Sequence, residues 1–486
     1  MNILSLITFL PLFGALAILA LPKERTRAIQ AVALASSGLS LALCVALLFF
    51  FSRTSPDMQF VEKLPWIPSI GVQYFLGVDG LSYPLVLLTA LMTLVSLIAS
   101  LNIKNRVKEY FFWFLILEVG MLGVFAALDL VLFYIFWEIT LVPMYFLIGI
   151  WGGPKKEYAA IKFFLYTLTG SVFMLLGILA VYFRSSPHTF DLLALMRGNS
   201  SWDLKFQIVI FIAFYLGFAV KVPAFPFHTW LPLAHVEAPT AVSVVLAAVL
   251  LKMGVYGIMR VSYGLLPLGF SWFLPILVVI AVINIVYGAL CAMAQQDMKK
   301  MVAYSSINHM GYCLLGIAGV TATGFSGALL QMVNHGIITG MLFLLVGVIY
   351  DRAHTRDISA FGGLAAKVPI YAGIMSLACF ASLGLPGLAG FVSEFLCFLG
   401  AFMRWKVYTA ISVLGLLTTA AFFLRMLEKV FLGPLNPKWA DLADVDAREL
   451  CALIPLTALT IYLGVYPKPA LDLMNSTIIH MASLLK

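Results

Sequence analysis

Six ionisable side chains lie inside long apolar stretches of the sequence. They are Glu138, Lys221, Lys252, His309, His335 and Glu394. If these stretches cross a membrane, each charged group costs at least ~2.5–3.5 kcal/mol on insertion scales and needs a partner, water or a task. Burial disfavours the charged form of an amine and a nearby carboxylate favours it, so acids and bases in alternation can exchange protons. Histidines can pass protons between them. The six residues are therefore candidates for a proton path.

Structural explanations compete with this interpretation for the acid and the two lysines. Glu138 and Lys221 could form only a buried ion pair that fixes helix packing. Lys252 could reach the membrane surface if its span were shifted, although seven apolar or small residues flank it on each side. The isolated residues are weak signals, and the argument for proton movement comes from the whole row.

The histidines and two further acids carry different expectations. A core histidine explains His309 as well as a functional one does, whereas the more central position of His335 favours function. Glu118 and Asp129 lie nearer the ends of their apolar stretches. Capping of a helix, or pairing near the surface, is the expectation for both acids.

The composition determines which elements hold these residues. Of 486 residues, 62% are hydrophobic and 11% are charged, against ~25% charged in an average soluble domain. An all-α polytopic membrane protein fits, whereas disordered, collagen-like, coiled-coil and disulfide-scaffold classes are excluded. Most of the net charge of +8 lies in short loops, where membrane topology explains it better than nucleic acid. The six cysteines are scattered singly, so neither an iron–sulfur cluster nor a structural zinc site is predicted.

Apolar runs between charged or Pro/Gly-rich breaks predict about fourteen transmembrane helices. The expected ranges are 3–21, 29–51, 81–101, 110–128, 130–150, 160–183, 206–227, 238–260, 272–294, 301–320, 325–350, 368–400, 407–432 and 450–467. Two of them should be broken helices, because 206–227 ends in two prolines and 368–400 contains a Gly- and Pro-rich centre at 384–390. Broken helices survive in a membrane only inside protein or beside water.

Broken helices in corresponding places suggest two inverted five-helix repeats. Helices four to eight form the first and helices nine to thirteen the second, and the odd number of helices inverts one relative to the other. The chain then divides into N-terminal helices, first repeat, second repeat, and helix fourteen with its tail, at 1–109, 110–260, 261–432 and 433–486. The segments 52–80 and 184–205 could lie along the membrane interface, and 468–486 resembles an amphipathic tail.

Loop charge predicts the orientation. Odd-numbered loops hold sixteen Lys and Arg residues and even-numbered loops hold eight. By the positive-inside rule the odd loops face the cytoplasm, and with fourteen helices both termini lie outside.

The sequence around the two buried lysines resembles a known signature. The stretch from Ala219 to Val244, which reads AVKVPAFPFHTWLPLAHVEAPTAVSV, and the stretch LKMGVYG from Leu251 carry the likeness. Both resemble the antiporter-like membrane subunits of respiratory complex I. The same signature occurs in multisubunit cation/proton antiporters and membrane-bound hydrogenases, and the likeness extends over nearly the whole chain.

Three features resemble the M-type branch of this superfamily. Glu394, in the sequence GFVSEF, stands where the L and N relatives have a lysine. The chain ends soon after the predicted fourteenth helix, without the long lateral helix of the L type. The stretches FLPLFG from Phe9 and GVDGLS from Gly77 also fit.

The resemblance implies a proton-translocating membrane subunit of an NADH–quinone oxidoreductase in a bacterial inner membrane. It makes Glu138 and Lys221 the coupled pair of a first half-channel, Lys252 and His335 the central connection, with His309 less firmly assigned, and Glu394 the terminal residue of a second half-channel. It implies no cofactor in this chain, whereas NADH, flavin, iron–sulfur clusters and quinone belong to partner subunits. Expected partners are the L- and N-type subunits, lipid and protons, but not nucleic acid.

Two other functions stay open on the sequence. A subunit of a multisubunit cation/proton antiporter or of a membrane-bound hydrogenase would carry similar buried acids and lysines. A membrane cytochrome with His309 and His335 as axial haem ligands is the third and weakest reading.

Overall fold

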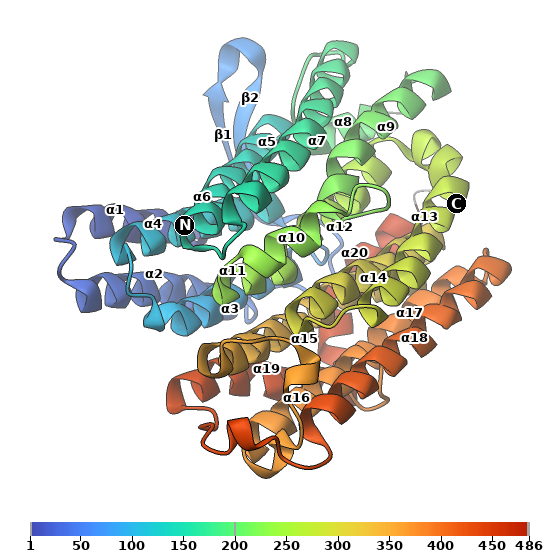
Figure 1. Cartoon of the computed structure of the whole chain (residues 1–486). Helices are drawn as coiled ribbons and strands as arrows, with labels where there is room; N and C mark the ends of the chain where they lie inside the picture. The colour runs from blue at the N-terminus through green and yellow to red at the C-terminus, as the bar shows by residue number, and fades with distance from the viewer. Residues whose placement is uncertain (1, 199–200, 484–486) are drawn as a thin grey trace.

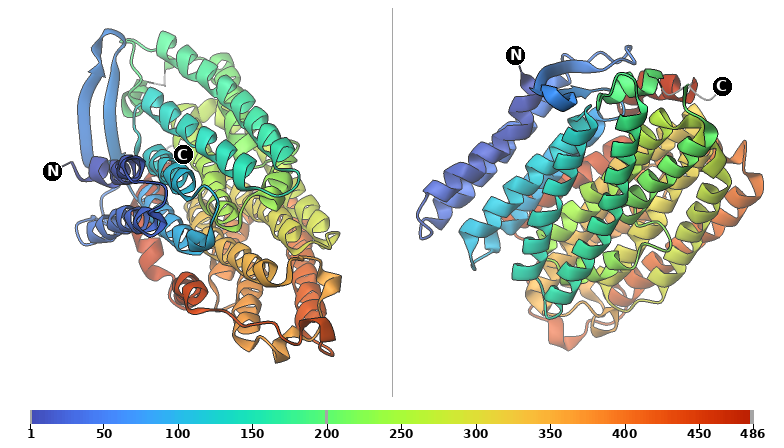
Figure 2. Two further views of the ribbon diagram at one scale, coloured as in Figure 1. Left: turned by 60° about the vertical axis from the view of Figure 1, so that its left-hand side comes forward. Right: turned by 90° about the horizontal axis from the view of Figure 1, so that it is seen from above.

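The computed structural model describes residues 2–198 and 201–483, most of which are helical. The helices pack side by side in one bundle (Figure 1), and a β-hairpin and both termini lie at the same end of it (Figure 2, right). Within the described residues, twelve helices are long and apolar enough to cross a membrane. The predicted class, a helical polytopic membrane protein, is confirmed.

Each of the fourteen predicted ranges coincides with a helical segment. The first seven ranges hold α1 (Ile3–Ala20), α2 (Thr26–Leu47), α3 (Tyr83–Ala99), α4 (Val107–Ala126), α5 (Leu130–Ile139), α6 (Leu141–Trp151), α7 (Lys156–Arg184) and α9 (Leu204–Lys221). The other seven hold α11 (Thr240–Val245), α12 (Leu251–Gly257), α13 (Pro267–Met293), α14 (Met298–Ala318), α15 (Ala322–Ala353), α16 (Pro369–Ser382), α17 (Ala389–Phe402), α18 (Lys406–Phe431) and α19 (Ala447–Val465). Outside these ranges lie α8 (Leu192–Gly198), α10 (Trp230–Glu237) and α20 (Lys468–Ser483).

The difference between fourteen ranges and twelve long apolar helices has a physical explanation. The segments α16 and α17 are halves of one broken helix, and each has only 14 residues. The helix α14 has 21 residues, but lysines, serines, Asn308 and His309 lower its hydropathy. Polar content of this kind belongs to a helix that lines a site inside the protein.

Both predicted helix breaks are present. The first separates α9, which ends at Lys221, from α10, which begins at Trp230. The second separates α16, which ends at Ser382, from α17, which begins at Ala389. The run Thr240–Tyr263 is helical throughout, but π-helical turns at Leu246–Leu250 and Ile258–Tyr263 interrupt its α-helical hydrogen bonding. The sequence did not predict these π-helical turns.

The segment 52–80 departs from the all-α expectation, because it contains an antiparallel hairpin of β1 (Gln59–Ile67) and β2 (Val72–Val78). Aromatic and β-branched residues favour strands, and Gly71, at φ +71°, allows the chain to turn between them. The hairpin caps α1, because Oε1 of Glu62 accepts a 2.7 Å hydrogen bond from the backbone N–H of Leu4.

The most buried helices lie at the centre of the bundle. In the 18-residue apolar stretch of each helix, the buried share is 100% for Thr240–Tyr263 and 94% for α15. The same share is only 28% for α2 and for α19. Because these helices are buried, the side chains of Lys252 and His335 have almost no contact with the surroundings of the protein and depend on protein groups for hydrogen bonds. The central helices therefore position the candidate site.

Candidate functional site

The centre of the site is a contact between Lys252 and His335. Nζ of Lys252 lies 2.6 Å from Nδ1 of His335 and donates a 2.5 Å hydrogen bond to the carbonyl of Ala247. Ala247 precedes the lysine by five residues and belongs to the first π-helical segment. Such turns are frequent at functional sites. Here the widened turn supplies a carbonyl that holds the amine against the histidine.

His309 connects these residues to the second broken helix. Its Nδ1 lies 3.1 Å from Oε1 of Glu394, and its Nε2 lies 3.0 Å from Oγ of Ser382. Nε2 of Gln331 lies 3.4 Å from the same oxygen of Glu394. The sequence left open whether His309 was a core residue. Its contacts with an acid and a hydroxyl group place it in the polar cluster.

His309 and His335 both line a small cavity, together with Glu394. The ring centroids of the two histidines are 5.4 Å apart. The cavity has about 10 Å³ of room for the centre of a water molecule, which is about the space that one water needs. Nε2 of His335 has no hydrogen-bond partner among the described residues, and a water here would supply one. Lys252, His335, His309 and Glu394 thus form one buried row, here called the central row.

Lys221 lies apart from the central row, at the last residue of α9. Its Nζ lies 3.4 Å from Oγ1 of Thr140 and within 5.4 and 5.6 Å of the ring centroids of Trp137 and Phe163. Aromatic faces and the negative end of a helix dipole both stabilise a cation. The chain places the amine where helical backbone, hydroxyl and ring faces replace part of its hydration.

Glu138 and Lys221 do not form the direct ion pair that the sequence allowed. Among the described residues, Nζ of Lys221 has no oxygen of Glu138 within 4.0 Å. Glu138 lies on α5, one turn after Tyr134, with which it interacts. Its Oε1 is buried and lacks a hydrogen-bond partner among the described residues. The two charges act on each other across a gap rather than as a packed pair.

Asparagine side chains stabilise the backbone at both breaks. Asn284 of α13 accepts a 2.8 Å hydrogen bond from the N–H of Phe225 and donates one of 3.2 Å to the carbonyl of Pro223. Asn334 of α15 donates a 2.7 Å hydrogen bond to the carbonyl of Ala389. Broken helices need such partners because membrane lipid offers none.

Two glycines allow helices of the site to approach each other. A Cβ at Gly254, two residues after Lys252, would lie 2.8 Å from the backbone nitrogen of Val222. A Cβ at Gly390 would lie 2.0 Å from the carbonyl oxygen of Ala381. Both positions exclude any side chain. The first keeps the helix of Lys252 against the end of α9, and the second keeps α17 against α16.

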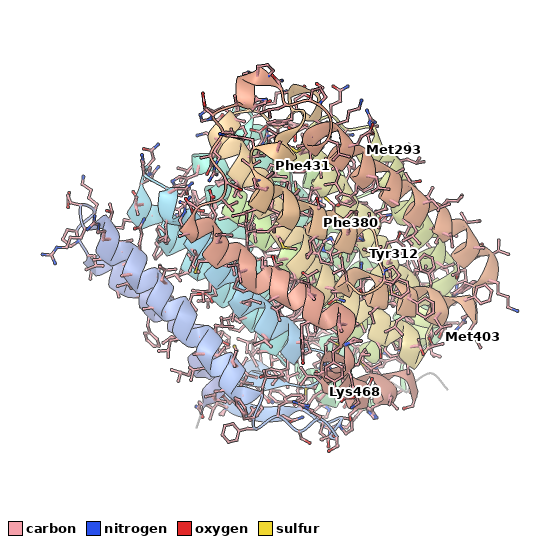
Figure 3. All side chains as sticks on the ribbon, turned by 90° about the horizontal axis from the view of Figure 1, so that it is seen from below. Met293, Tyr312, Phe380, Met403, Phe431 and Lys468 are labelled. Atoms are coloured by element: carbon pink, nitrogen blue, oxygen red, sulfur yellow. The ribbon has the colours of Figure 1, made fainter. Side chains whose placement is uncertain are left out.

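The central row lies midway along the bundle. In Figure 3, Met293 and Phe431 mark one end of the bundle, Lys468 marks the other, and Tyr312 lies between them. The rings of Tyr312 and His309 are 5.9 Å apart. The histidine is therefore near mid-depth, where ionisable side chains are most costly.

His235 was missed as a candidate, although it lies in the stretch that carries the resemblance. It is fully buried in α10, and neither ring nitrogen has a hydrogen-bond partner in the described residues. Its ring stacks on Phe343 at 4.5 Å, and both Lys299 and Lys252 act on it electrostatically. The signal that could have found it is its position, three residues before the predicted helix 238–260 that carries Lys252.

One of the two remaining acids differs from expectation. Asp129 caps α5, as predicted, by accepting hydrogen bonds of 2.9 and 3.1 Å from the N–H groups of Val131 and Leu132. Glu118 neither caps nor lies near a surface. It is fully buried in α4, where Ser37 donates a 3.0 Å hydrogen bond to it. The expectation was wrong because residue 118 lies in the middle turns of α4, as it also does in the predicted range 110–128, and not near a helix end.

Family models and relatives agree with the sequence signature. The model described as "NADH:quinone oxidoreductase/Mrp antiporter, TM" matches residues 127–421, and "NADH-ubiquinone oxidoreductase chain 4, amino terminus" matches residues 9–125. The chain is 45% identical to NADH-quinone oxidoreductase subunit M of Rhodobacter capsulatus over 499 aligned residues, which cover 99% of this chain and 96% of the relative.

Solved structures share the fold. A chain of respiratory complex I from Thermus thermophilus with bound NADH superposes with a TM-score of 0.91 at 32% identity, covering 99% of this chain and all of the other. A chain of the Mrp complex from Dietzia sp. DQ12-45-1b gives a TM-score of 0.87 at 22% identity over the whole of both chains. The second likeness concerns the fold alone.

Proposed function

The chain belongs to the NADH:quinone oxidoreductase/Mrp antiporter family, among the M subunits of NADH-quinone oxidoreductase, and from this premise we propose that it moves protons across the membrane in such a complex. Electron transfer takes place elsewhere in the complex and drives the movement. The observation that carries the proposal is the central row. In it, an amine, two imidazoles and a carboxylate lie next to one another in space, near the middle of the bundle.

The geometry of the central row supports stepwise proton transfer. A protonated Lys252 donates its hydrogen bond to Nδ1 of His335. When the proton moves onto Nδ1, the ring releases another proton from Nε2 into the small cavity. The proton reaches Nε2 of His309 through a water and the hydroxyl of Ser382, which also lines the cavity, and Nδ1 of the same ring then releases a proton to Oε1 of Glu394. Each step breaks one N–H or O–H bond and forms another, and no bond between heavy atoms changes.

Glu138 and Lys221 form the first half-channel in this account. Lys221 sits at a helix break, where water can enter and the helix dipole and ring faces hold the charge. Glu138 contributes its negative charge across a gap, so a change at one residue alters the charge preference of the other. Lys252 and His335 then connect this half to Glu394, the terminal acid of the second half-channel.

Two corresponding backbone bridges support the inverted repeat. In the first five-helix unit, Asp129, just before α5, bridges Asp191, just after α7. In the second unit, Asp297, just before α14, bridges Asp357, just after α15. Each bridge consists of two hydrogen bonds of 2.9 Å in the same pattern. Equivalent pairings at equivalent helices support the division at 110–260 and 261–432, with fourteen crossings in all.

The proposal includes a setting for the chain, which the family assignment supports. The chain takes its place in a bacterial inner membrane, with both termini on the outer side, beside other membrane subunits that include the L and N types. NADH, flavin, iron–sulfur clusters and quinone bind to partner subunits, and this chain holds no cofactor of its own.

Two other readings have less support. A cation/proton antiporter or hydrogenase subunit shares the fold, but the identity of 45% to an M subunit favours the oxidoreductase. In the haem reading, His309 and His335 would clamp an iron atom between them. Both nitrogens of His309 already contact Glu394 and Ser382, so the geometry does not favour ligation.

The direct test is proton pumping by the assembled complex. Inverted membrane vesicles that contain the complex should acidify on addition of NADH and a quinone, and a complex with both Lys252→Met and His335→Phe should transfer electrons with little acidification. Normal acidification by the double variant would overturn the proposal.

A further inference from the structure

Gln331 of α15 lies against two members of the central row. Its Nε2 is 3.4 Å from Oε1 of Glu394 and 3.5 Å from Nδ1 of His309. These two atoms are 3.1 Å apart, so they form a triangle with the amide nitrogen. All three side chains are buried, so the surroundings of the protein barely reach these contacts. The amide therefore touches both atoms between which the last proposed proton transfer takes place.

A neighbouring serine determines which way the amide of Gln331 points. Oγ of Ser393, on α17, lies 2.5 Å from Oε1 of Gln331. This distance is usual for an O–H···O hydrogen bond, whereas N–H···O bonds are longer, at about 2.7–3.2 Å. The backbone carbonyls of Gly390 and Ala389 lie farther from Oγ, at 3.1 and 3.4 Å, so Gln331 is the nearest of these acceptors. The oxygen of the amide thus faces the serine, and its NH₂ group faces the central row.

Asn334 completes a chain of hydrogen bonds. Its Nδ2 donates a 2.7 Å hydrogen bond to the carbonyl of Ala389, at the start of α17, and one of 3.2 Å to Oγ of Ser393. Because a carbonyl can only accept, the first bond fixes the orientation of the Asn334 amide. The second occupies a lone pair of the serine and leaves the hydroxyl proton for Gln331. The backbone of the second helix break thus orients, through two side chains, the donor that faces Glu394.

An amide donor in this place acts on the charge of the terminal acid. Hydrogen bonds to a carboxylate favour its charged form over its protonated form. A hydrogen bond to a charged group is also roughly twice as strong as one between neutral groups. The NH₂ group of Gln331 therefore favours the state in which Glu394 has given up its proton and can accept the next one from His309.

We infer that Gln331 is a positioning residue of the second half-channel: its amide holds Oε1 of Glu394 beside the ring of His309 and promotes release of each proton that the acid receives. The inference rests on the proposed function and adds a residue to it. In the transfer, the N–H bond at Nδ1 of His309 breaks and an O–H bond forms at Oε1 of Glu394. The amide keeps its own protons and can donate to whichever of the two atoms has a free lone pair.

The other groups around Glu394 do not duplicate this donor. The titratable groups that face Glu394 are His309, Tyr312 and Cys313 of α14, His335 of α15 and Cys397 of α17. Phenols and thiols have ordinary pKa values of about 10 and 8.5, so only the histidines titrate near neutral pH. Both histidines are unchanged in the variants below. A difference in pH dependence between wild type and a Gln331 variant thus reports the loss of the amide.

The test is the pH dependence of the number of protons pumped per electron by the assembled complex in inverted vesicles. Gln331→Met keeps the length of the side chain and removes its donors. Glu394 should then hold its proton more tightly. The pH at which pumping falls to half on the acid side should rise by about one unit, a tenfold change in proton affinity. At alkaline pH, pumping should approach the wild-type ratio again.

Gln207→Met is the matched control. Gln207 is a buried glutamine whose amide also bonds to other parts of the chain, because it donates to the carbonyl of Trp202 and accepts from the N–H of Leu268. These contacts lie at the start of α13, away from the central row. The control should therefore show the wild-type pH dependence, even if its complex is less stable.

A purely structural role of Gln331 would lower pumping by the same factor at every pH, and that result would overturn the inference. An unchanged pH dependence in Gln331→Met, or an equal shift in Gln207→Met, would overturn it as well. If Gln331→Met does not assemble, Ser393→Ala decides the question. It frees the amide of Gln331 to turn and should give a smaller shift in the same direction, whereas no shift would refute the inference.

Failure of this inference can be distinguished from failure of the proposed function. Loss of pumping in Glu394→Gln together with a wild-type pH dependence in Gln331→Met would remove Gln331 alone and leave the proton path standing. Normal pumping in Glu394→Gln would remove the terminal acid from the path, and the role of Gln331 would fall with it.

Discussion

At the scale of single residues, Lys221 shows how a membrane protein can hold an amine without a direct ion pair. Its neighbours are the hydroxyl of Thr140 and two aromatic faces, and the carboxylate of Glu138 lies beyond 4.0 Å. Such surroundings tolerate the charge without fixing it. An amine held in this way can lose its proton and regain it when a nearby charge changes.

Lys221→Ala should therefore abolish redox-coupled proton pumping but not assembly. A mid-membrane lysine is a cost to folding, so its removal leaves the helices intact. The measurement is vesicle acidification together with the amount of complex in the membrane. Lys205→Ala, on the exposed start of the same helix, is the control and should pump normally. Acidification at the normal rate by Lys221→Ala would remove it from the path.

Glu138 should act through its charge. Glu138→Gln keeps the shape of the side chain but removes the negative charge that attracts the proton on Lys221, so pumping should fall at least roughly tenfold, the change that 1.4 kcal/mol produces. Glu138→Asp keeps the charge and should retain partial pumping. Equal and near-normal rates in both variants would leave Glu138 with a packing role only.

At the scale of the elements, the site depends on deviations from regular helices. Lys221 and Glu394 lie at or just after the two breaks, and Lys252 follows a π-helical turn, whereas the asparagines of α13 and α15 satisfy the backbone at the breaks. In a regular helix, the position of a side chain is determined by its spacing along the sequence. A break or a π-helical turn changes that position and leaves backbone groups or side chains free to contact other helices.

Gly390→Ala should destabilise the protein by at least about 1–3 kcal/mol, the usual cost of overpacking. The new methyl group would lie 2.0 Å from the carbonyl of Ala381, so α16 and α17 must separate. Thermal unfolding of the detergent-solubilised complex measures the loss. Gly373→Ala is the matched control, because nothing lies within 4 Å of its added Cβ. Equal stability of the two variants would contradict the close approach.

Prediction from the sequence succeeded for some elements and failed for others, for physical reasons. Long apolar runs and Pro/Gly clusters are local signals, and they predicted the helices and both breaks. The partner of His309 lies 85 residues away on another helix, so no local pattern could reveal its contact with Glu394. The π-helical turn at Ala247 has no local sequence signal. The buried contact of Glu118 depends on Ser37, 81 residues away on another helix.

At the scale of the whole molecule, equivalent bridges at Asp129 and Asp297 support the proposed division into two halves. One half carries Lys221 at its break and the other carries Glu394, with Lys252 and His335 between them. If the two halves have the proposed opposite orientation, they can open toward opposite sides of the membrane. The arrangement therefore suits a path whose entrance and exit lie on different faces.

The topology makes a prediction of its own. Both termini lie at the same end of the bundle (Figure 2, right) and should face outward, while the basic loop at 152–155 should face the cytoplasm. Protease sites inserted at each terminus and in this loop can be cleaved in right-side-out and in inverted vesicles. Cleavage of the termini in inverted vesicles only would reverse the orientation.

The central claim is that protons leave the row of Lys252, His335 and His309 through Glu394. The most direct test is the number of protons pumped per electron in Glu394→Gln, measured in vesicles together with electron transfer and assembly. Glutamine keeps the size of the side chain and its hydrogen bonds but cannot carry the proton, so pumping should fall strongly while assembly is unchanged. Glu394→Lys should retain some pumping, because the path needs an exchangeable proton of either charge type. Normal pumping by Glu394→Gln across the whole pH range would contradict the account.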